Sequence, residues 1–153
     1  MGFDQISLKG RALRLLAGRE HSRAELQRKL SPHETEPGEL ARALDELQAK
    51  GFINEQRVLE SVLHRRATRL GAARVRQELQ AKGLDPQAVA DAVAGLQETE
   101  EVRAREVWRK KFGEPPQDAA EHGRQVRFLL TRGFSAAAVR RVVRGRAGDE
   151  DET

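Results

Sequence analysis

Three segments of the chain repeat the same order of core and helix-end residues about every fifty positions. Leu26, Leu79 and Leu129 anchor the repeat and lie 53 and 50 residues apart. A basic residue follows each anchor by three positions, and two further apolar residues follow that, as Val89 and Val93 do after Leu79. A unit this small cannot bury its apolar face alone, so neighbouring units must stack. The sequence therefore predicts three tandem units that share their cores.

Apolar residues recur at helical spacing along the whole chain, as in Leu13, Leu16 and Ala17. No segment alternates apolar and polar residues for long enough to indicate a strand. Capping patterns, such as Ser22 followed by Glu25, mark helix starts, and glycines mark helix ends. We expect an all-α fold with roughly nine short helices, arranged as three tandem three-helix, helix-turn-helix-like repeats in an elongated, curved array.

The expected organisation of the chain follows from this register. An N-terminal tail occupies 1–8, the three repeats occupy 9–53, 54–101 and 102–147, and an acidic tail occupies 148–153. Stacked repeats of this kind present a long surface without a deep pocket. Such a surface favours a macromolecular partner over a small substrate.

Charge is distributed in blocks. The chain has 28 Lys or Arg and 24 Asp or Glu, a formal net charge of +4, and without the acidic tail the rest carries +8. Residues 57–82 carry a net +5, residues 85–101 a net −5, and residues 124–146 hold seven Arg and no acid. Solvated helix faces that pair with one another explain part of this pattern. The last block has no acid within helical reach, which favours docking to a charged polymer or filament.

Catalytic and metal-binding patterns are missing from the sequence. There is no Cys, no nucleophile elbow and no glycine-rich phosphate loop, and the four His are far apart. We therefore expect no enzyme activity, no cofactor and no metal. Glu98, Glu100 and Glu101 are expected at a solvated helix end, and Trp108 in a core. The sequence shows no export signal or apolar span, which predicts a cytoplasmic protein without a membrane contact.

Several strings resemble the RecX family of regulators of the RecA recombinase. They are REHS at 19–22, EL at 25–26, RKL at 28–30, GFIN at 51–54, RVRQEL at 74–79, KG at 82–83, RKKFGEP at 109–115, RFL at 127–129 and RGF at 132–134. These strings run in the family's order and cover about residues 10–145. One departure is at Gly71, where the family carries an aromatic residue and a proline and this chain has Leu70 and Ala72.

The resemblance implies a non-enzymatic regulator that binds in the groove of the RecA–single-stranded DNA filament and bridges neighbouring protomers. It implies inhibition of RecA ATP hydrolysis, strand exchange and co-protease activity, and so modulation of DNA repair, recombination and the SOS response. We expect a monomer whose partner is the RecA filament, with single- or double-stranded DNA as a weak secondary ligand.

Two basic sets are the candidate contacts to RecA or DNA. The first comprises Arg65, Arg66, Arg69, Arg74, Arg76 and Lys82, and the second comprises Arg127, Arg132, Arg140, Arg141 and Arg144. Pairing of Arg76 with Glu78 inside the fold is an alternative use of one of these cations. Two other functions stay open, namely a helix-turn-helix-like DNA-binding module that acts independently of RecA and a scaffold without a DNA link. The acidic residues after Gly83 argue against a DNA-reading helix there.

Aromatic residues at the predicted helix ends form a last group. Phe52, Phe128 and Phe134 each stand beside a helix-ending glycine or within the turn before it. Phenylalanine buries a large apolar area, so we expect these three rings in the cores or between stacked units.

Overall fold

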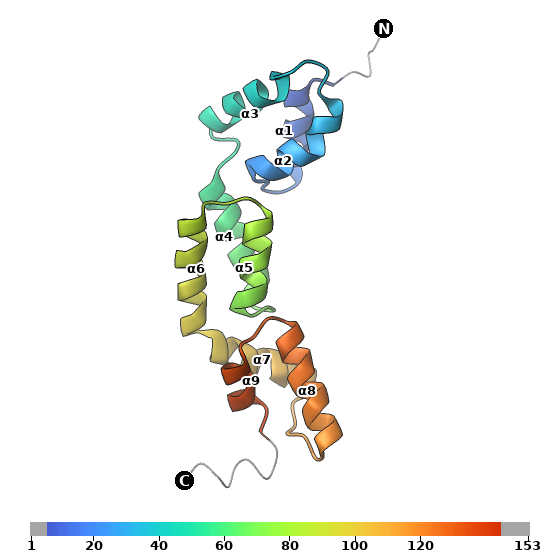
Figure 1. Cartoon of the computed structure of the whole chain (residues 1–153), viewed down its shortest axis with the longest axis vertical. Helices are drawn as coiled ribbons and strands as arrows, with labels where there is room; N and C mark the ends of the chain where they lie inside the picture. Colours follow the sequence, from blue (N-terminus) through green and yellow to red (C-terminus); the bar gives the residue numbers. More distant parts are fainter. Residues whose placement is uncertain (1–5, 145–153) are drawn as a thin grey trace. The chain divides into compact units, whose positions relative to one another are not determined.

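The computed structural model describes residues 6–144, and every regular element in this range is helical (Figure 1). The elements are α1 (Leu8–Gly18), α2 (Arg23–Leu30), a 3₁₀ turn (Ser31–His33), α3 (Glu39–Ala49), α4 (Glu55–Arg66), α5 (Ala72–Ala81), α6 (Pro86–Glu98), α7 (Glu100–Lys111), α8 (Ala119–Thr131) and α9 (Ala136–Val142). The predicted all-α fold is confirmed. The acidic tail at 148–153 and most of the N-terminal tail lie outside the described residues.

The described residues form two compact units. Unit 1 comprises residues 6–61 and 80–85, and unit 2 comprises residues 62–79 and 86–144. The predicted repeat boundaries and the elongated, curved array stay predictions. None of the helices within 6–144 is long and apolar enough to cross a membrane.

Unit 1 is built on the contacts among α1, α2 and α3. Its core consists of Leu8, Ala12, Leu26, Leu30, Leu40, Leu44, Leu47 and Ile53. The predicted capping box starts α2, because the Ser22 hydroxyl accepts a hydrogen bond from the Glu25 N–H and the Glu25 carboxylate accepts one from the Ser22 N–H. Phe52 was expected in a core or between stacked units, but the residue is 47% exposed, so it is not a core residue.

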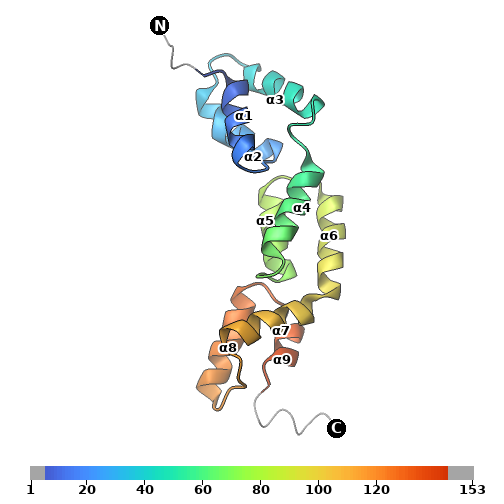
Figure 2. The same ribbon diagram turned by 180° about the vertical axis from the view of Figure 1, so that it is seen from behind.

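In unit 2, α7 packs against both α8 and α9 (Figure 2). The core between them consists of Ala104, Leu129, Phe134, Val139, Val142 and Val143. Trp108 packs at the edge of this core, and its Nε1–H donates to Gln125 Oε1 at 2.8 Å. The predicted core role of Phe134 is confirmed, while Trp108 and Phe128 are half-buried and pack against this core.

The start of α5 is joined to the turn between α8 and α9 within unit 2. The Gly71 N–H donates to the Arg132 carbonyl at 2.8 Å, and a Cβ on Gly71 would overlap the backbone of Gly133. The Glu100 carboxylate accepts a hydrogen bond from the Ala72 N–H at 3.1 Å, which satisfies the first turn of α5. Glu100 is 7% exposed, so the expectation of a solvated position is wrong for this residue.

Arg103 of α7 stabilises the same part of unit 2, because it binds the segment that precedes α5. Its guanidinium donates to the carbonyls of Ala67, Leu70 and Leu96 at 2.6–2.8 Å. Burial lowers the pKa of Arg103, and the nearby Glu100 carboxylate opposes that shift. These contacts hold the segment after α4, which carries Thr68 and Arg69, close to α7.

Candidate functional site

Three of the predicted cations form ion pairs inside their own unit. The Arg66 guanidinium donates two hydrogen bonds to the Glu78 carboxylate, from Nε to Oε2 at 3.1 Å and from Nη2 to Oε1 at 2.9 Å. Lys82 Nζ contacts Glu25 Oε1 at 3.0 Å, and Arg141 contacts Glu101 more loosely at 3.6 Å. An exposed pair at such a distance contributes little, but these contacts reduce the positive charge that a partner meets.

The Lys82 pair belongs to a buried network in unit 1. Glu25 also contacts Arg19 Nη2 at 2.7 Å, and its side chain is only 8% exposed. Burial alone raises the pKa of Glu25, but hydrogen bonds from Arg19, Ser22 and Lys82 outweigh it and lower the pKa to about 2. Lys82 is therefore a structural residue in this unit.

Three more predicted cations make other contacts within the chain. Arg74 Nη1 donates to the Thr131 carbonyl at 3.1 Å, and Arg144 Nε donates to the Arg141 carbonyl at 2.9 Å. Arg65 also interacts within the chain. The alternative pairing of Arg76 with Glu78 is wrong, because Arg66 forms the ion pair with Glu78 and Arg76 is exposed.

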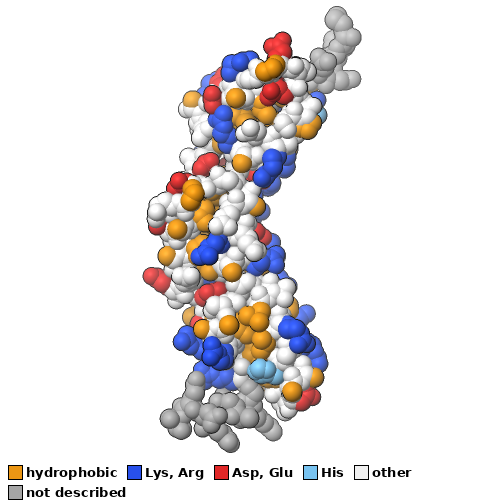
Figure 3. All heavy atoms as spheres, viewed as in Figure 1, with side chains coloured by type: hydrophobic (Ala, Val, Ile, Leu, Met, Phe, Trp, Pro, Cys, Tyr) orange, Lys and Arg blue, Asp and Glu red, His pale blue; other side chains and the backbone are white. Residues whose placement is uncertain are grey.

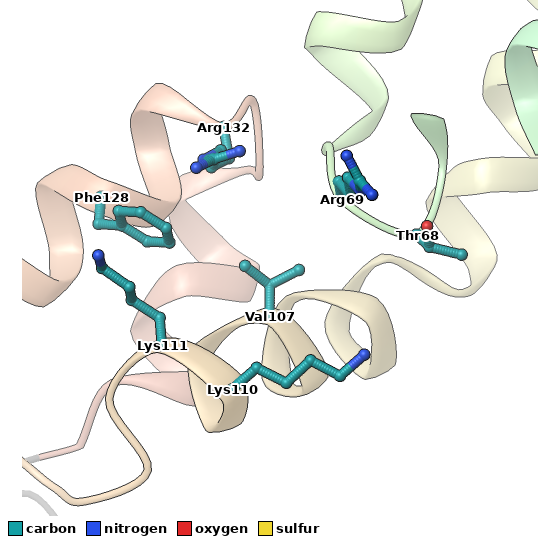
Figure 4. Close-up of a pocket in the computed structure, with 7 residues that line it drawn as sticks. All are labelled: Thr68, Arg69, Val107, Lys110, Lys111, Phe128 and Arg132. Atoms are coloured by element: carbon teal, nitrogen blue, oxygen red, sulfur yellow. The ribbon is translucent and has the colours of Figure 1, made fainter. Parts of the chain in front are cut away.

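The remaining predicted cations have no carboxylate within ion-pair distance among residues 6–144. They are Arg69, Arg76, Arg127, Arg132 and Arg140. Two of them, Arg69 from the first predicted set and Arg132 from the second, line the same cleft of unit 2 (Figure 4).

This basic cleft has a volume of about 520 Å³ and lies between the end of α7, the end of α8 and the segment that follows α4. Its lining comprises Thr68, Arg69, Val107, Lys110, Lys111, Phe128 and Arg132. Figure 4 shows Val107 rising from α7 into the middle of the cleft, with Phe128 on one side and Thr68 and Arg69 on the other. The cleft therefore has an apolar floor and a rim with four cations.

Phe128 organises the cations at one end of the basic cleft. Lys111 Nζ lies 5.4 Å and Arg132 Cζ lies 4.8 Å from the centre of its ring, and Phe112 packs edge-on against the same ring at 5.5 Å. An aromatic ring attracts a cation without cancelling its charge. Of the four rim cations, only Lys110 has a carboxylate within ion-pair distance among residues 6–144, namely Glu106 at 3.8 Å. The cleft therefore keeps its positive charge.

Figure 3 shows one face of the part of the molecule that α7, α8 and α9 form. On this face, Lys and Arg side chains flank an exposed hydrophobic strip. Among residues 6–144, no three His, Asp or Glu side chains gather as a metal site would require. The cleft offers cations and apolar surface, which is chemistry for binding.

Sequence reasoning missed five of the seven lining residues. Lys110 and Lys111 fall between the two basic sets, and Thr68, Val107 and Phe128 carry no charge. Grouping cations by their position along the chain also placed Arg69 and Arg132 in different sets. A usable signal was present, since Phe128 stands immediately before the anchor Leu129, where the other two repeats have a glutamate.

Comparisons with known proteins agree with the fold. Three family models match the chain, namely the first three-helix domain of RecX over residues 9–47, the second over residues 54–93 and the third over residues 98–143. A crystal structure of a regulatory protein RecX matches with a TM-score of 0.67 at 20% identity, covering 88% of this chain and 70% of that one. RecX from Lactobacillus salivarius matches with a TM-score of 0.66 at 20% identity, covering 89% of this chain and 92% of that one.

Curated relatives are similar over nearly the whole chain. The regulatory protein RecX of Leptothrix cholodnii is 58% identical over 140 residues, which cover 92% of this chain and 89% of the relative. That of Ralstonia nicotianae is 49% identical over 140 residues, which cover 92% and 88%. The three domain matches and these identities show the family that the sequence motifs predicted. The chain belongs to the RecX family of non-enzymatic regulatory proteins.

Proposed function

We propose that this chain regulates RecA by binding as a monomer in the groove of the RecA–single-stranded DNA filament. Binding there inhibits RecA ATP hydrolysis, strand exchange and co-protease activity, and so modulates DNA repair, recombination and the SOS response. A ligand that contacts adjacent protomers needs only to favour one state of the filament to shift its assembly. Filling the groove also excludes duplex DNA and a cleavable repressor by steric overlap.

The observation that carries this proposal is the basic cleft of unit 2. Its rim holds Arg69, Lys111 and Arg132 without a carboxylate partner among the described residues, and its floor is apolar. Unneutralised cations around an apolar floor suit a macromolecular surface that offers acids and apolar side chains together.

The alternative is a helix-turn-helix-like module that binds DNA independently of RecA. It finds little support in α6, the helix that follows Gly83, because its sequence contains Asp91 and Glu98 and no cation. The helix after Gly133, α9, has seven residues and buries Ala138, Val139 and Val142 against its unit. Arg140 of α9 is exposed and is suited to weak, sequence-independent contact with DNA phosphate. Weak DNA binding is therefore the secondary activity that we propose.

Titration of the protein into a RecA–single-stranded DNA ATPase assay tests the proposal. We expect inhibition at fewer than one copy per RecA protomer. Binding to DNA without RecA, measured in parallel at two salt concentrations, is expected to be weak and to fall steeply with salt. Tight DNA binding without an effect on the ATPase would favour the alternative and contradict the proposal.

A double substitution of Arg69 and Arg132 to Ala addresses the cleft within the same assay. Neither side chain has a carboxylate within ion-pair distance in the described part of the chain, so their loss removes charge from the rim without breaking an ion pair there. Arg66 is left intact because it holds Glu78. We expect inhibition to weaken by about tenfold or more, since hydrogen bonds to charged groups contribute about 1.5–3 kcal/mol each.

A matched control is Arg124→Ala, which removes an exposed cation of unit 2 that does not line the basic cleft. Its inhibition should stay within about twofold of the unmodified protein, as expected for a screened surface charge. Equal losses in the control and in the double variant would show that overall charge, and not the cleft, drives docking.

A further inference from the structure

Each of the three domains has a cation at or directly after the end of its first helix and, further along, a residue directly before its anchor leucine. The first position is the cation at the end of the first helix, which is Arg19 directly after α1, Arg66 at the end of α4 and Lys111 at the end of α7. The second position is the residue before the anchor leucine, which is Glu25, Glu78 or Phe128. The three anchors Leu26, Leu79 and Leu129 are all fully buried, which fixes this register.

In the first two domains this pair is an ion pair. Arg19 contacts Glu25 at 2.7 Å, and Arg66 contacts Glu78 at 2.9 Å. The glutamate neutralises the cation of its own domain in both cases. Glu25 of the first domain also neutralises Lys82, a residue of the second domain that follows the anchor Leu79 by three positions.

In the third domain the glutamate is replaced by Phe128. Lys111 and Arg132 lie over the ring of Phe128, and Arg132 stands three positions after its anchor, as Lys82 does. The ring keeps both cations in place but supplies no negative charge. In unit 1 one carboxylate pairs with two cations, whereas Lys111 and Arg132 line the basic cleft without a carboxylate within ion-pair distance among residues 6–144.

We propose that the partner supplies this missing carboxylate, and that the basic cleft of unit 2 receives a peptide segment of the filament in which an acidic residue stands beside an apolar one. The carboxylate contacts Lys111 and Arg132, and the apolar side chain covers Val107 and Phe128. The identity of the partner rests on the proposed function, whereas the chemistry of the ligand rests on the cleft alone.

The lining favours a peptide over a nucleic acid. Single-stranded nucleic acid binds by stacking its bases on open aromatic faces. Here two cations, Lys111 and Arg132, lie over the Phe128 ring, in the place that a stacked base would need. A phosphate group buries no apolar surface against Val107, whereas a leucine or isoleucine beside an acid does. In the other two domains the cation at the first position pairs with a carboxylate.

Direct binding is the first test. The probe is a blocked hexapeptide of alternating Glu and Leu, compared with its Gln–Leu and Glu–Ser counterparts and with a short oligothymidine of equal charge. Amide chemical shifts of the full chain report the site. We expect the Glu–Leu peptide to shift the amides around Lys111, Phe128 and Arg132 and to bind at least about tenfold more tightly than the other probes. Equal or tighter binding of the oligothymidine or of the Glu–Ser peptide at these amides, or shifts elsewhere, would overturn the proposal.

The second test restores the internal carboxylate. Phe128→Glu gives the third domain the residue that the first two have, so Lys111 and Arg132 gain an acid inside the chain. We expect inhibition of the RecA ATPase and binding of the Glu–Leu peptide to fall together, by about tenfold or more. Phe128→Gln has nearly the same size as the Glu variant without its charge and should lose less.

The outcomes separate this inference from the proposed function. If the unmodified protein inhibits RecA and Phe128→Glu inhibits equally, the inference is wrong and the proposed function stands. If the unmodified protein does not inhibit RecA but binds the Glu–Leu peptide in a manner that Phe128→Glu abolishes, the cleft chemistry is correct and the proposed partner is wrong. Circular dichroism and thermal unfolding confirm that each variant is folded.

Discussion

The first and third domains differ most at the residue before the anchor leucine. In the first domain Glu25 is buried and joins two cations, Arg19 and Lys82, in one network. In the third domain Phe128 holds Lys111 and Arg132 by its ring and leaves them charged. One position of a repeated scaffold therefore joins a buried ion-pair network in one copy and leaves the neighbouring cations charged in another.

The second domain lies between these extremes. Glu78 and Arg66 form the same ion pair, but their side chains are 28% and 37% exposed, so water already screens it. Because repeats need only a compatible buried leucine to stack, the residue beside that leucine can change without altering the fold. The residue before the anchor leucine therefore pairs with cations where it is a glutamate and leaves them charged where it is a phenylalanine.

Removal of the Glu25 carboxylate should have the largest effect. Glu25→Ala leaves Arg19 and Lys82 without their shared partner and breaks the capping box of α2. We expect a loss of about 3 kcal/mol in the free energy of unfolding, typical of breaking a buried ion pair from one side. Urea denaturation at neutral pH measures it.

Glu78→Ala is the matched variant for this comparison. It removes the equivalent carboxylate from a pair that is partly exposed, so we expect a loss of at most about 1 kcal/mol. Equal losses in the two variants would show that the burial of Glu25 gives it no special role, and the contrast between the domains would fail.

The pH dependence of stability sharpens the same contrast. The pKa of Glu25 is about 2 in the folded chain and about 4.5 for an ordinary glutamate. Its contribution is therefore present above about pH 4.5 and is lost as the pH falls towards 2, by at most about 3 kcal/mol. Urea midpoints measured from pH 6 to pH 2 should fall less steeply for Glu25→Gln than for the unmodified chain.

Glu46 provides the control for that titration. Its pKa is also lowered to about 2, by hydrogen bonds from Lys9 and Lys50, but the group is fully exposed. Salt screens exposed pairs far more than buried ones. At 1 M salt, Glu46→Gln should leave the pH dependence unchanged, while Glu25→Gln should still reduce it. The same response from both variants at high salt would contradict a buried role for Glu25.

Much of the fold could be predicted from the sequence because helices are encoded locally. The capping box of Ser22 and Glu25 follows from neighbours within one turn, and it forms as expected. The buried anchors Leu26, Leu79 and Leu129 follow from their regular spacing. Local signals therefore sufficed for the elements and for the repeat.

The candidate site could be predicted only in part because it depends on contacts between distant segments. Arg69 and Arg132 share a cleft because Gly71 bonds to the Arg132 carbonyl, and no local pattern encodes that contact. Glu100 reads as a solvated acid in the sequence, but it is buried because it caps α5 from another helix. Charge counted along the chain cannot distinguish a cation that already has a partner, such as Lys82, from one that does not.

The smallest expected effect tests whether Phe128 truly occupies the position of Glu25 and Glu78. If it does, a glutamate there reaches Lys111 and Arg132, and Phe128→Glu should be more stable than Phe128→Gln by about 0.5–1 kcal/mol at low salt. The two variants lose the same ring contacts with Phe112, so their difference isolates the charge. Thermal unfolding at neutral pH should show this difference shrinking in 1 M salt, because the cleft is open to solvent. Equal stability at low salt would mean that the cations of the third domain lie beyond the reach of a carboxylate at this position, and the equivalence of the three pairs would fail.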